Sequence, residues 1–192
     1  MRLAVDLGCL GRDVKVGDSI AINGVCLTVS QVSGVAATFD VSGETLGKST
    51  LGKLTASSVV NVEDAMKPSD RFGGHFVLGH VDGIANIKSI MKKGDFRDIS
   101  FSAPAELLDQ MVAKGSVAVD GISLTIASMD DSSFSVAIIP QTWQNTNLHM
   151  RRPGDWVNIE TDIIVKTVQK QLRNALPAKD SLTVEKLKQL GF

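Results

Sequence analysis

The sequence has no tyrosine, only two cysteines, no surplus of basic charge and no long hydrophobic run. Its 20 Lys and Arg residues against 21 Asp and Glu residues give a net charge of −1. The basic stripe that is typical of a nucleic-acid-binding protein is therefore absent. No apolar stretch approaches the roughly 18 residues that a membrane span needs. We therefore expect a soluble protein that binds neither nucleic acid nor a membrane.

Motifs for a metal or nucleotide site are also lacking. Cys9 and Cys26 form no CxxC pair, and we interpret them as reduced thiols of a cytoplasmic protein, or of an organellar one if a preceding segment carried targeting. His75 and His80 are five residues apart and would lie on opposite faces of a strand, so we expect no metal site. The stretch 43–49 has three residues between its glycines, where a phosphate-binding loop needs four.

A tandem duplication organises the chain. Residues 19–29 (SIAINGVCLTV) match residues 116–126 (SVAVDGISLTI) at an offset of 97, with five of eleven positions identical. The same offset pairs three further blocks: Glu44-Thr45 with Gln141-Thr142, Ser49–Leu51 with Thr146–Leu148, and Val60–Glu63 with Val157–Glu160. Four blocks at one constant offset predict two copies of a unit of about 97 residues.

Each unit is predicted to be a small β-barrel. In the first copy, apolar alternation over 19–22 and 27–32 predicts two strands joined by a tight Asn23-Gly24 turn. The second copy has Asp120-Gly121 at the same place. Many short strands with Gly-rich turns favour a closed barrel, which also removes exposed sheet edges. The expected fold is therefore all-β, with two tandem barrels and a C-terminal helix.

The offset leaves the start of the second unit without a counterpart in the first. The second unit begins near Gly73, and Met1 corresponds to Asp98, which lies partway into that unit. We therefore expect the first barrel to lack about two dozen residues, including its opening strand. Either the sequence begins late, which we favour, or the protein works with an incomplete first barrel.

A helical pattern follows the second unit. Apolar residues recur there every four positions until Pro177 ends the helix, and they form a stripe of Ile164, Val168, Leu172 and Leu176. A second short helix is expected over 181–190. Two interpretations of the stripe stay open: it mediates self-association, or it folds back on its own barrel. The predicted domains are a first barrel over 1–70, a second over 71–162, and oligomerisation helices over 163–192.

Polar residues recur at the same strand positions in both units. Cys26 and Thr28 are two apart, so they face the same side of a strand, and Ser123 and Thr125 repeat this arrangement. The simpler interpretation is that these groups line a hairpin, with their hydroxyls bonded to the backbone. The alternative is that they line a ligand site at the same place in each unit.

Several longer motifs resemble riboflavin synthases of the trimeric, alpha-subunit type. They are GVCLT at 24–28, GGHFVLGHVDG at 73–83, VDGISLT at 119–125, IIPQT at 138–142 and VNIETD at 157–162. They agree with that family in order and spacing from about residue 16 to residue 172. The resemblance implies two tandem six-stranded Greek-key barrels, the first of them incomplete, in a homotrimer.

The resemblance also implies a reaction. Two molecules of 6,7-dimethyl-8-ribityllumazine exchange a four-carbon unit without a cofactor, giving riboflavin and 5-amino-6-ribitylamino-pyrimidinedione. Each barrel would bind one substrate, and the reacting pair would meet where the first barrel of one subunit faces the second barrel of another. The substrate ring itself stabilises the carbanion formed at its 7-methyl group, so the protein needs only to orient two rings and relay protons.

The family's ligand-binding residues map onto both units. In the first barrel they are Cys26, Leu27 and Thr28, with Asp40, Val41, Ser42, Gly43, Glu44 and Thr45 as the opposite wall. In the second barrel they are Gly79, His80, Val81, Lys114, Ser123, Leu124, Thr125, Ala137, Ile138, Ile139, Pro140, Gln141 and Thr142. The resemblance assigns proton transfer to His80, Ser123, Thr125 and Asp162, assisted by Cys26 and Asp120. Simpler roles stay open for three of these: turn shaping by Asp120, helix capping by Asp162, and apolar packing by Cys26.

Alternative functions follow from the same features. The family's opening motif, Met-Phe-Thr-Gly-Ile, is absent, so one expectation is ligand binding in the second barrel alone, or a truncated and inactive product. A lumazine protein shares the duplicated fold and catalyses nothing, but its second-barrel Ser-Leu-Thr motif is degraded, whereas Ser123-Leu124-Thr125 is intact here. A flavin-reductase-type barrel is excluded because its flavin motif needs a tyrosine.

Overall fold

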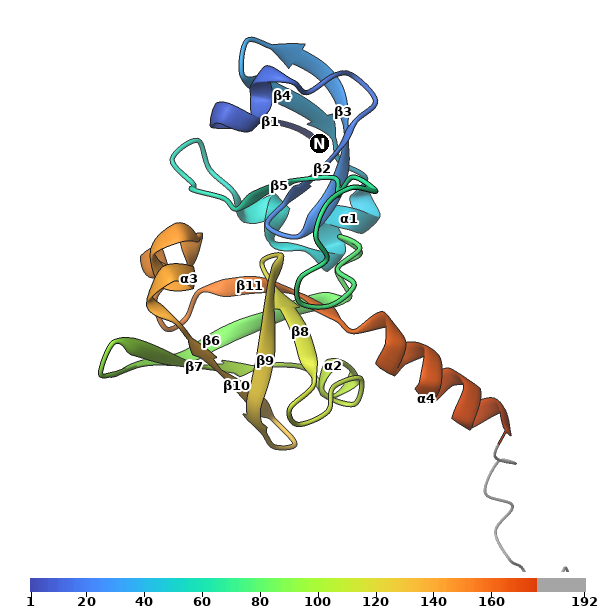
Figure 1. The fold of residues 1–192 in the computed structure, drawn as a ribbon, viewed down its shortest axis with the longest axis vertical. Helices are drawn as coiled ribbons and strands as arrows, with labels where there is room; N and C mark the ends of the chain where they lie inside the picture. Colours follow the sequence, from blue (N-terminus) through green and yellow to red (C-terminus); the bar gives the residue numbers. More distant parts are fainter. Residues whose placement is uncertain (176–192) are drawn as a thin grey trace, which may run out of the picture.

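The computed structural model describes residues 1–175, which form two stacked β units and a helix that projects from the second unit (Figure 1). The strands of the first unit are β1 (Arg2–Asp6), β2 (Ser19–Ile22), β3 (Val25–Ser33), β4 (Ala36–Asp40) and β5 (Val62–Asp64). Its short helices are η1 (Gly8–Arg12), α1 (Gly43–Lys48) and η2 (Thr50–Lys53).

The second unit repeats this order of elements. Its strands are β6 (Gly83–Lys93), β7 (Phe96–Ser102), β8 (Ser116–Val119), β9 (Ile122–Met129), β10 (Ser133–Ile138) and β11 (Trp156–Thr161). Its short helices are α2 (Ala105–Leu108), α3 (Pro140–Asn145) and η3 (Asn147–Met150). Helices α3 and η3 lie 97 residues after α1 and η2, so the repeat found in the sequence is also the repeat of the fold.

The two units differ at one strand. The second unit is a closed six-stranded barrel in the order β10-β7-β6-β11-β8-β9, as expected. The first unit is a five-stranded sheet in the order β1-β4-β3-β2-β5, so β1 and β5 are its edges. Strand β6 has no counterpart in it. The first unit is therefore an open sheet, and the structure gives no support for interpreting this difference as residues lost from the chain.

Alternation along the strands gives each unit its own core. In β3, alternate residues from Val25 to Val29 are buried, while Cys26 and Thr28 are exposed on one face, as predicted. Strand β9 repeats this pattern in the second barrel. The core of that barrel includes Phe101 and Phe134, whose ring centroids are 5.0 Å apart. Burial of the apolar face therefore leaves the recurring thiol and hydroxyl groups on the opposite face.

Helix α4 (Ile163–Ala175) is joined to the second unit by polar contacts on one of its sides. Lys166 Nζ lies 2.8 Å from both carboxylate oxygens of Asp82. One turn further on, Gln169 Nε2 donates to the carbonyl oxygen of Asp109 at 2.7 Å. These contacts orient the helix so that it extends away from both units (Figure 1).

The apolar stripe of α4 faces away from the barrel. Ile164, Val168 and Leu172 are 54%, 51% and 53% exposed, so the stripe does not fold back on its own unit. Leu176 and the predicted second helix lie outside the described residues. Within residues 1–175, no helix combines the length and the apolar character that crossing a membrane requires.

Candidate functional site

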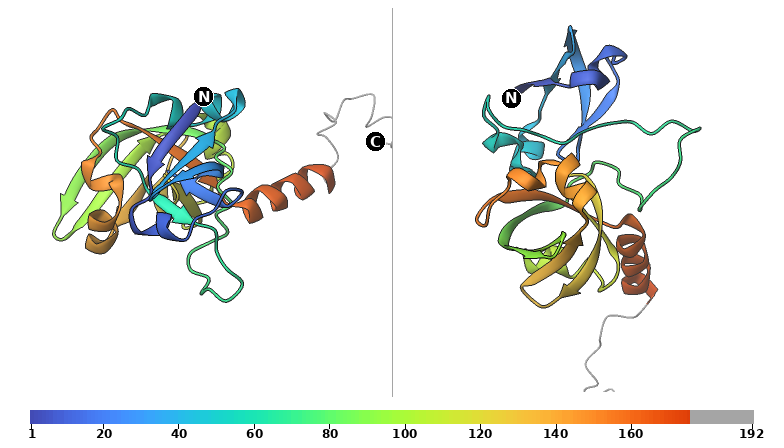
Figure 2. Two further views of the ribbon diagram at one scale, coloured as in Figure 1. Left: turned by 90° about the horizontal axis from the view of Figure 1, so that it is seen from above. Right: turned by 60° about the vertical axis from the view of Figure 1, so that its left-hand side comes forward.

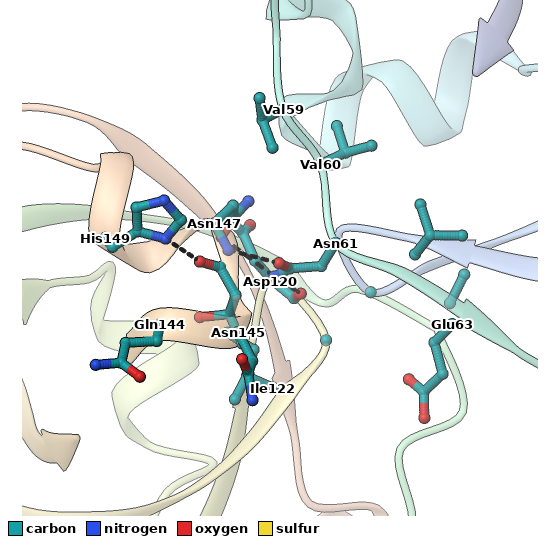
Figure 3. Close-up of a pocket in the computed structure, with 15 residues that line it drawn as sticks. Val59, Val60, Asn61, Glu63, Asp120, Ile122, Gln144, Asn145, Asn147 and His149 are labelled. Carbon is teal, nitrogen blue, oxygen red and sulfur yellow. Dashed lines mark hydrogen bonds between the residues drawn. The ribbon is translucent and has the colours of Figure 1, made fainter. Parts of the chain in front are cut away.

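The two units meet at a buried polar network in which the same bonds are made twice. Asn61 Nδ2 donates to the carbonyl oxygen of Asp120 at 2.9 Å, and its equivalent, Asn158 Nδ2, donates to that of Asn23 at 2.8 Å. The side-chain oxygens of Asn23 and Asp120 accept the backbone N–H groups of Asn61 and Asn158, both at 2.8 Å. Figure 3 shows Asn61, Asp120 and Asn147 converging at this point. The duplicated turns therefore face each other in an approximately twofold arrangement.

Asp120, expected to assist proton transfer, belongs to this network. Its side chain has no exposed surface, and its Oδ2 lies 2.7 Å from Arg151 Nη2. Burial raises the pKa of this carboxyl, although Arg151 and the N–H of Asn158 act in the opposite direction. The structure thus places Asp120 in the interface between the units and gives it no exposed surface at either cavity described below. Its assistance in proton transfer stays a prediction.

A cavity of about 280 Å³ in the first unit collects predicted site residues from two regions of the chain. It brings Cys26 of β3 together with Glu44 and Thr45 of α1. It also contains residues 79–81, which had been assigned to the second barrel. In the structure the N–H of Cys26 donates to the carbonyl oxygen of Gly79 at 2.9 Å, and Val81 packs against the core of the first unit, so these residues contribute to the first-unit cavity.

The wall opposite Cys26 is shaped by a helix cap. Ser42 Oγ accepts the N–H of Thr45 at 3.1 Å, and the two hydroxyl oxygens lie 2.9 Å apart. A serine in this position satisfies one of the free N–H groups at the start of α1. The short helix that follows presents Glu44 and Thr45 to the cavity.

A larger cavity of about 690 Å³ lies against the connection between β5 and β6, which swings out from the body of the protein (Figure 2). It contains both Cys26 and Ser123, which occupy equivalent positions in the two units. His75 also lines it, and His75 Nδ1 lies 2.8 Å from Ser123 Oγ. Sequence reasoning missed His75 as a site residue, although it stands in the same motif as His80. That motif could have pointed to His75, but the contact between His75 and Ser123 depends on the tertiary fold.

The surroundings of His75 favour one state of its ring. The side chain is 9% exposed, and its Nε2 is buried without a hydrogen-bond partner among residues 1–175. Burial lowers the pKa of His75, against the opposing charges of Asp162 and Glu160, so the ring is neutral at neutral pH. Because buried N–H groups without an acceptor are rare, we place the proton on Nδ1. Nδ1–H then donates to Ser123 Oγ and leaves the hydroxyl proton of Ser123 free for a ligand.

Replacing His75 by glutamine is expected to remove part of the pH dependence of stability. Since the folded protein holds His75 with a lowered pKa, the unfolded chain binds a proton first as pH falls below about 6.5. The wild type should therefore lose stability through this window, and the variant should lose less. Urea unfolding at pH 7 and pH 5 measures both free energies. Equal losses in the two proteins would contradict the placement of His75 in a buried, neutral state.

The remaining predicted residues fall into two groups. Four are core residues whose side chains point away from the exposed strand face: Leu27, Val41, Leu124 and Ile138. The others are at least partly exposed and lie outside both cavities: Thr28, Asp40, Ser42, Gly43, Lys114, Thr125, Ala137, Ile139, Pro140, Gln141, Thr142 and Asp162.

Two of these exposed residues have structural contacts of their own. Asp162 Oδ1 accepts the N–H of Ile164 at 2.9 Å, which is the helix-capping role left open from the sequence. Lys114 has a positive φ of 65° and donates from Nζ to the carbonyl oxygen of Ala127 at 3.0 Å. Neither contact excludes binding of a ligand.

Comparison with known proteins first defines the class. The lumazine binding domain family matches residues 2–65 and 78–162, which is one match for each unit. The fold is similar to the crystal structure of LumP complexed with riboflavin, with a TM-score of 0.78 and 23% identity over 83% of this chain and 87% of that chain. The LumP complex with 6,7-dimethyl-8-(1'-D-ribityl) lumazine gives a TM-score of 0.76 at 22% identity. The chain is thus a protein of two lumazine binding domains.

Sequence relatives narrow this class. The riboflavin synthase of Actinobacillus pleuropneumoniae is 43% identical, over 94% of this chain and 85% of that protein. The riboflavin synthase of Bacillus subtilis is 40% identical, over 100% of this chain and 90% of that protein. The chain belongs to the riboflavin synthase family, which confirms the resemblance found in its motifs.

Proposed function

We propose that this chain catalyses the riboflavin synthase reaction, the cofactor-free dismutation of two 6,7-dimethyl-8-ribityllumazine molecules into riboflavin and 5-amino-6-ribitylamino-pyrimidinedione. The observation that carries the proposal is identity of 40–43% to riboflavin synthases over nearly the whole chain. The geometry supports it, because Cys26 and Ser123 occupy equivalent, exposed strand positions in the two units. Each unit then holds one substrate molecule.

The proposed reaction needs only weakly reactive side chains, such as the thiol, hydroxyl and imidazole groups at the site. The lumazine ring delocalises the negative charge formed when its 7-methyl group loses a proton, so no strong base is required. In the first unit, Cys26, Thr45 and His80 surround the smaller cavity and orient one ring. In the second unit, Ser123 donates its hydroxyl proton while His75 holds its oxygen. Orientation of two rings supplies most of the rate enhancement in this scheme.

We also propose that the working form is a homotrimer in which α4 contributes to association. Its stripe of three half-exposed aliphatic residues is an apolar face that its own barrel leaves uncovered. Association would let the first unit of one subunit face the second unit of another. The apparent mass by light scattering should therefore be three times the chain mass, and Val168→Glu should lower it.

A non-catalytic lumazine-binding protein is the second candidate, and the comparisons do not favour it. The likeness to LumP is 22–23% in sequence and concerns the fold, whereas the relatives at 40–43% are riboflavin synthases. The second-unit motif Ser123-Leu124-Thr125 is also intact.

Incubation with 6,7-dimethyl-8-ribityllumazine tests the proposal. We expect riboflavin to form, detected by its absorbance, at one molecule for every two lumazines consumed. Ser123→Ala should still bind the lumazine, as seen by fluorescence, but form riboflavin at least about a hundredfold more slowly. Binding by the wild type without product would show a lumazine-binding protein instead. Absence of both binding and product would contradict the proposed function.

A further inference from the structure

A carboxylate of the second unit holds the segment that closes the pocket of the first. Glu160 lies near the end of β11 and is 3% exposed. Its Oε1 accepts the N–H of Leu78 at 2.8 Å, and its Oε2 accepts the N–H of Gly79 at 2.9 Å. Both oxygens of one buried carboxylate therefore bind consecutive backbone amides. Charge-assisted bonds of this kind are the stronger class of hydrogen bond, and two together fix the orientation of the backbone.

The clamped backbone leads directly into the first-unit pocket. With its N–H held by Glu160, Gly79 turns its carbonyl oxygen to the N–H of Cys26, 2.9 Å away. Gly79 has a positive φ of 77°, and a Cβ there would lie 2.5 Å from the Cβ of Cys26, so this approach requires glycine. The next two residues, His80 and Val81, line the cavity that contains Cys26. A chain of contacts thus runs from Glu160 through Gly79 to the pocket wall.

The duplication supplies a natural comparison for this clamp. Glu63 stands 97 residues before Glu160, in the equivalent strand β5. No hydrogen bond within residues 1–175 uses the Glu63 carboxylate, which in Figure 3 stands apart from the dashed bonds of the interface. Desolvation raises the pKa of Glu63, as expected for a carboxyl that gains no compensating donor. The same residue type is therefore a clamp in one unit and unengaged in the other.

We propose that Glu160 is a positioning residue for the first-unit ligand site: it does not touch the substrate, but sets the Gly79 and His80 wall through two backbone amides. The second unit thereby controls ligand affinity in the first. This inference rests on the proposed function, because it takes the smaller cavity to be a lumazine site. It also explains why a segment that follows the first unit in sequence completes the site of that unit.

The test compares Glu160→Gln with Glu106→Gln, which changes an exposed carboxylate of α2 that lines neither cavity, and uses Cys26 as a local reporter. Both cysteines are exposed, so alkylation by iodoacetamide can be followed at each by mass spectrometry, with Cys9 as the internal reference. In Glu160→Gln the side-chain NH2 group faces one of the two backbone N–H groups, so one hydrogen bond is replaced by two donors that face each other. This loosens the segment over Cys26. We expect Cys26, relative to Cys9, to be alkylated faster than in the wild type. The lumazine concentration that halves the alkylation rate of Cys26 should rise at least about tenfold. Glu106→Gln should change neither quantity by more than about twofold.

The controls separate positioning from general destabilisation. Circular dichroism and thermal unfolding establish that each variant is folded, and Glu160→Asp, which keeps the charge but is one methylene shorter, replaces Glu160→Gln if the latter does not fold. The proposal is overturned if lumazine protects Cys26 in the Glu160 variant as well as it does in the wild type, or if Glu106→Gln has the same effect as Glu160→Gln. Should the wild type show neither protection of Cys26 nor riboflavin formation, the proposed function itself fails. If the wild type forms riboflavin but the Glu160 variant shows unchanged alkylation and protection of Cys26, only the positioning role is refuted.

Discussion

Gly24→Ala is expected to destabilise the folded chain by at least about 3 kcal/mol, because it combines backbone strain with an overlap that no side chain can relieve. Gly24 has a positive φ of 75°, and a Cβ there would lie 2.5 Å from the backbone nitrogen of Gly121 in the other unit. The two glycines are equivalent in the repeat, and each is packed against the backbone of the other. Alanine would therefore push the two units apart at the centre of their interface.

A matched control lies in α1. Gly47 has no positive φ, and a Cβ there would meet no atom within 4 Å. Gly47→Ala should therefore be neutral or stabilise by up to about 1 kcal/mol. Urea unfolding of the two variants and the wild type measures the difference. A loss below about 1 kcal/mol for Gly24→Ala would mean that the units do not meet through these turns.

Asp120→Ala is expected to lower the free energy of unfolding by about 3 kcal/mol, and Asp120→Asn is expected to lower it clearly less. Alanine leaves the buried N–H of Asn158 without its acceptor and Arg151 without its ion-pair partner. Asparagine keeps the first contact, since Asn23 makes the equivalent bond to Asn61 at 2.8 Å in the first unit. Burial also penalises the charge that asparagine removes.

The same unfolding measurement distinguishes the two contributions of Asp120. If Asp120→Asn is nearly as stable as the wild type, the backbone contact dominates and the repeat has conserved its geometry through two different side chains. An equal cost for both variants would instead assign the stabilisation to the pair with Arg151. In neither case should Asp120→Asn abolish riboflavin formation, because the carboxyl has no exposed surface at either cavity.

Together these contacts make the two units one structural body around the site. The network of Asn23, Asn61, Asp120 and Asn158 sets the position of both hairpins that carry Cys26 and Ser123. Substitutions at the interface should therefore change ligand binding even where they touch no ligand. This explains why a protein with two similar domains builds its cavities from residues of both.

The sequence by itself determined the architecture and the family. The offset of 97 identified the two units, and alternation in β3 correctly predicted that Cys26 and Thr28 lie on the same face of the strand. These features are local, because strand periodicity specifies which side of a strand a residue occupies. The motifs, read as a set, identified the riboflavin synthase family, which the relatives confirm. The apolar stripe of α4 was also predicted, but the sequence left open whether it packs against its own barrel.

Only the tertiary structure decided which residues meet. Glu160 and the N–H of Leu78 are 82 residues apart, and His75 and Ser123 are 48 apart, so no periodicity in the chain predicts either pair. For the same reason the sequence did not predict that residues 79–81, which fall within the second family match, pack back against Cys26 of the first unit. The burial of Asp120 could not be predicted either, because it is a property of the interface between the units. Local patterns specify which face a side chain occupies, but its partner depends on long-range packing that forms only when the two units come together.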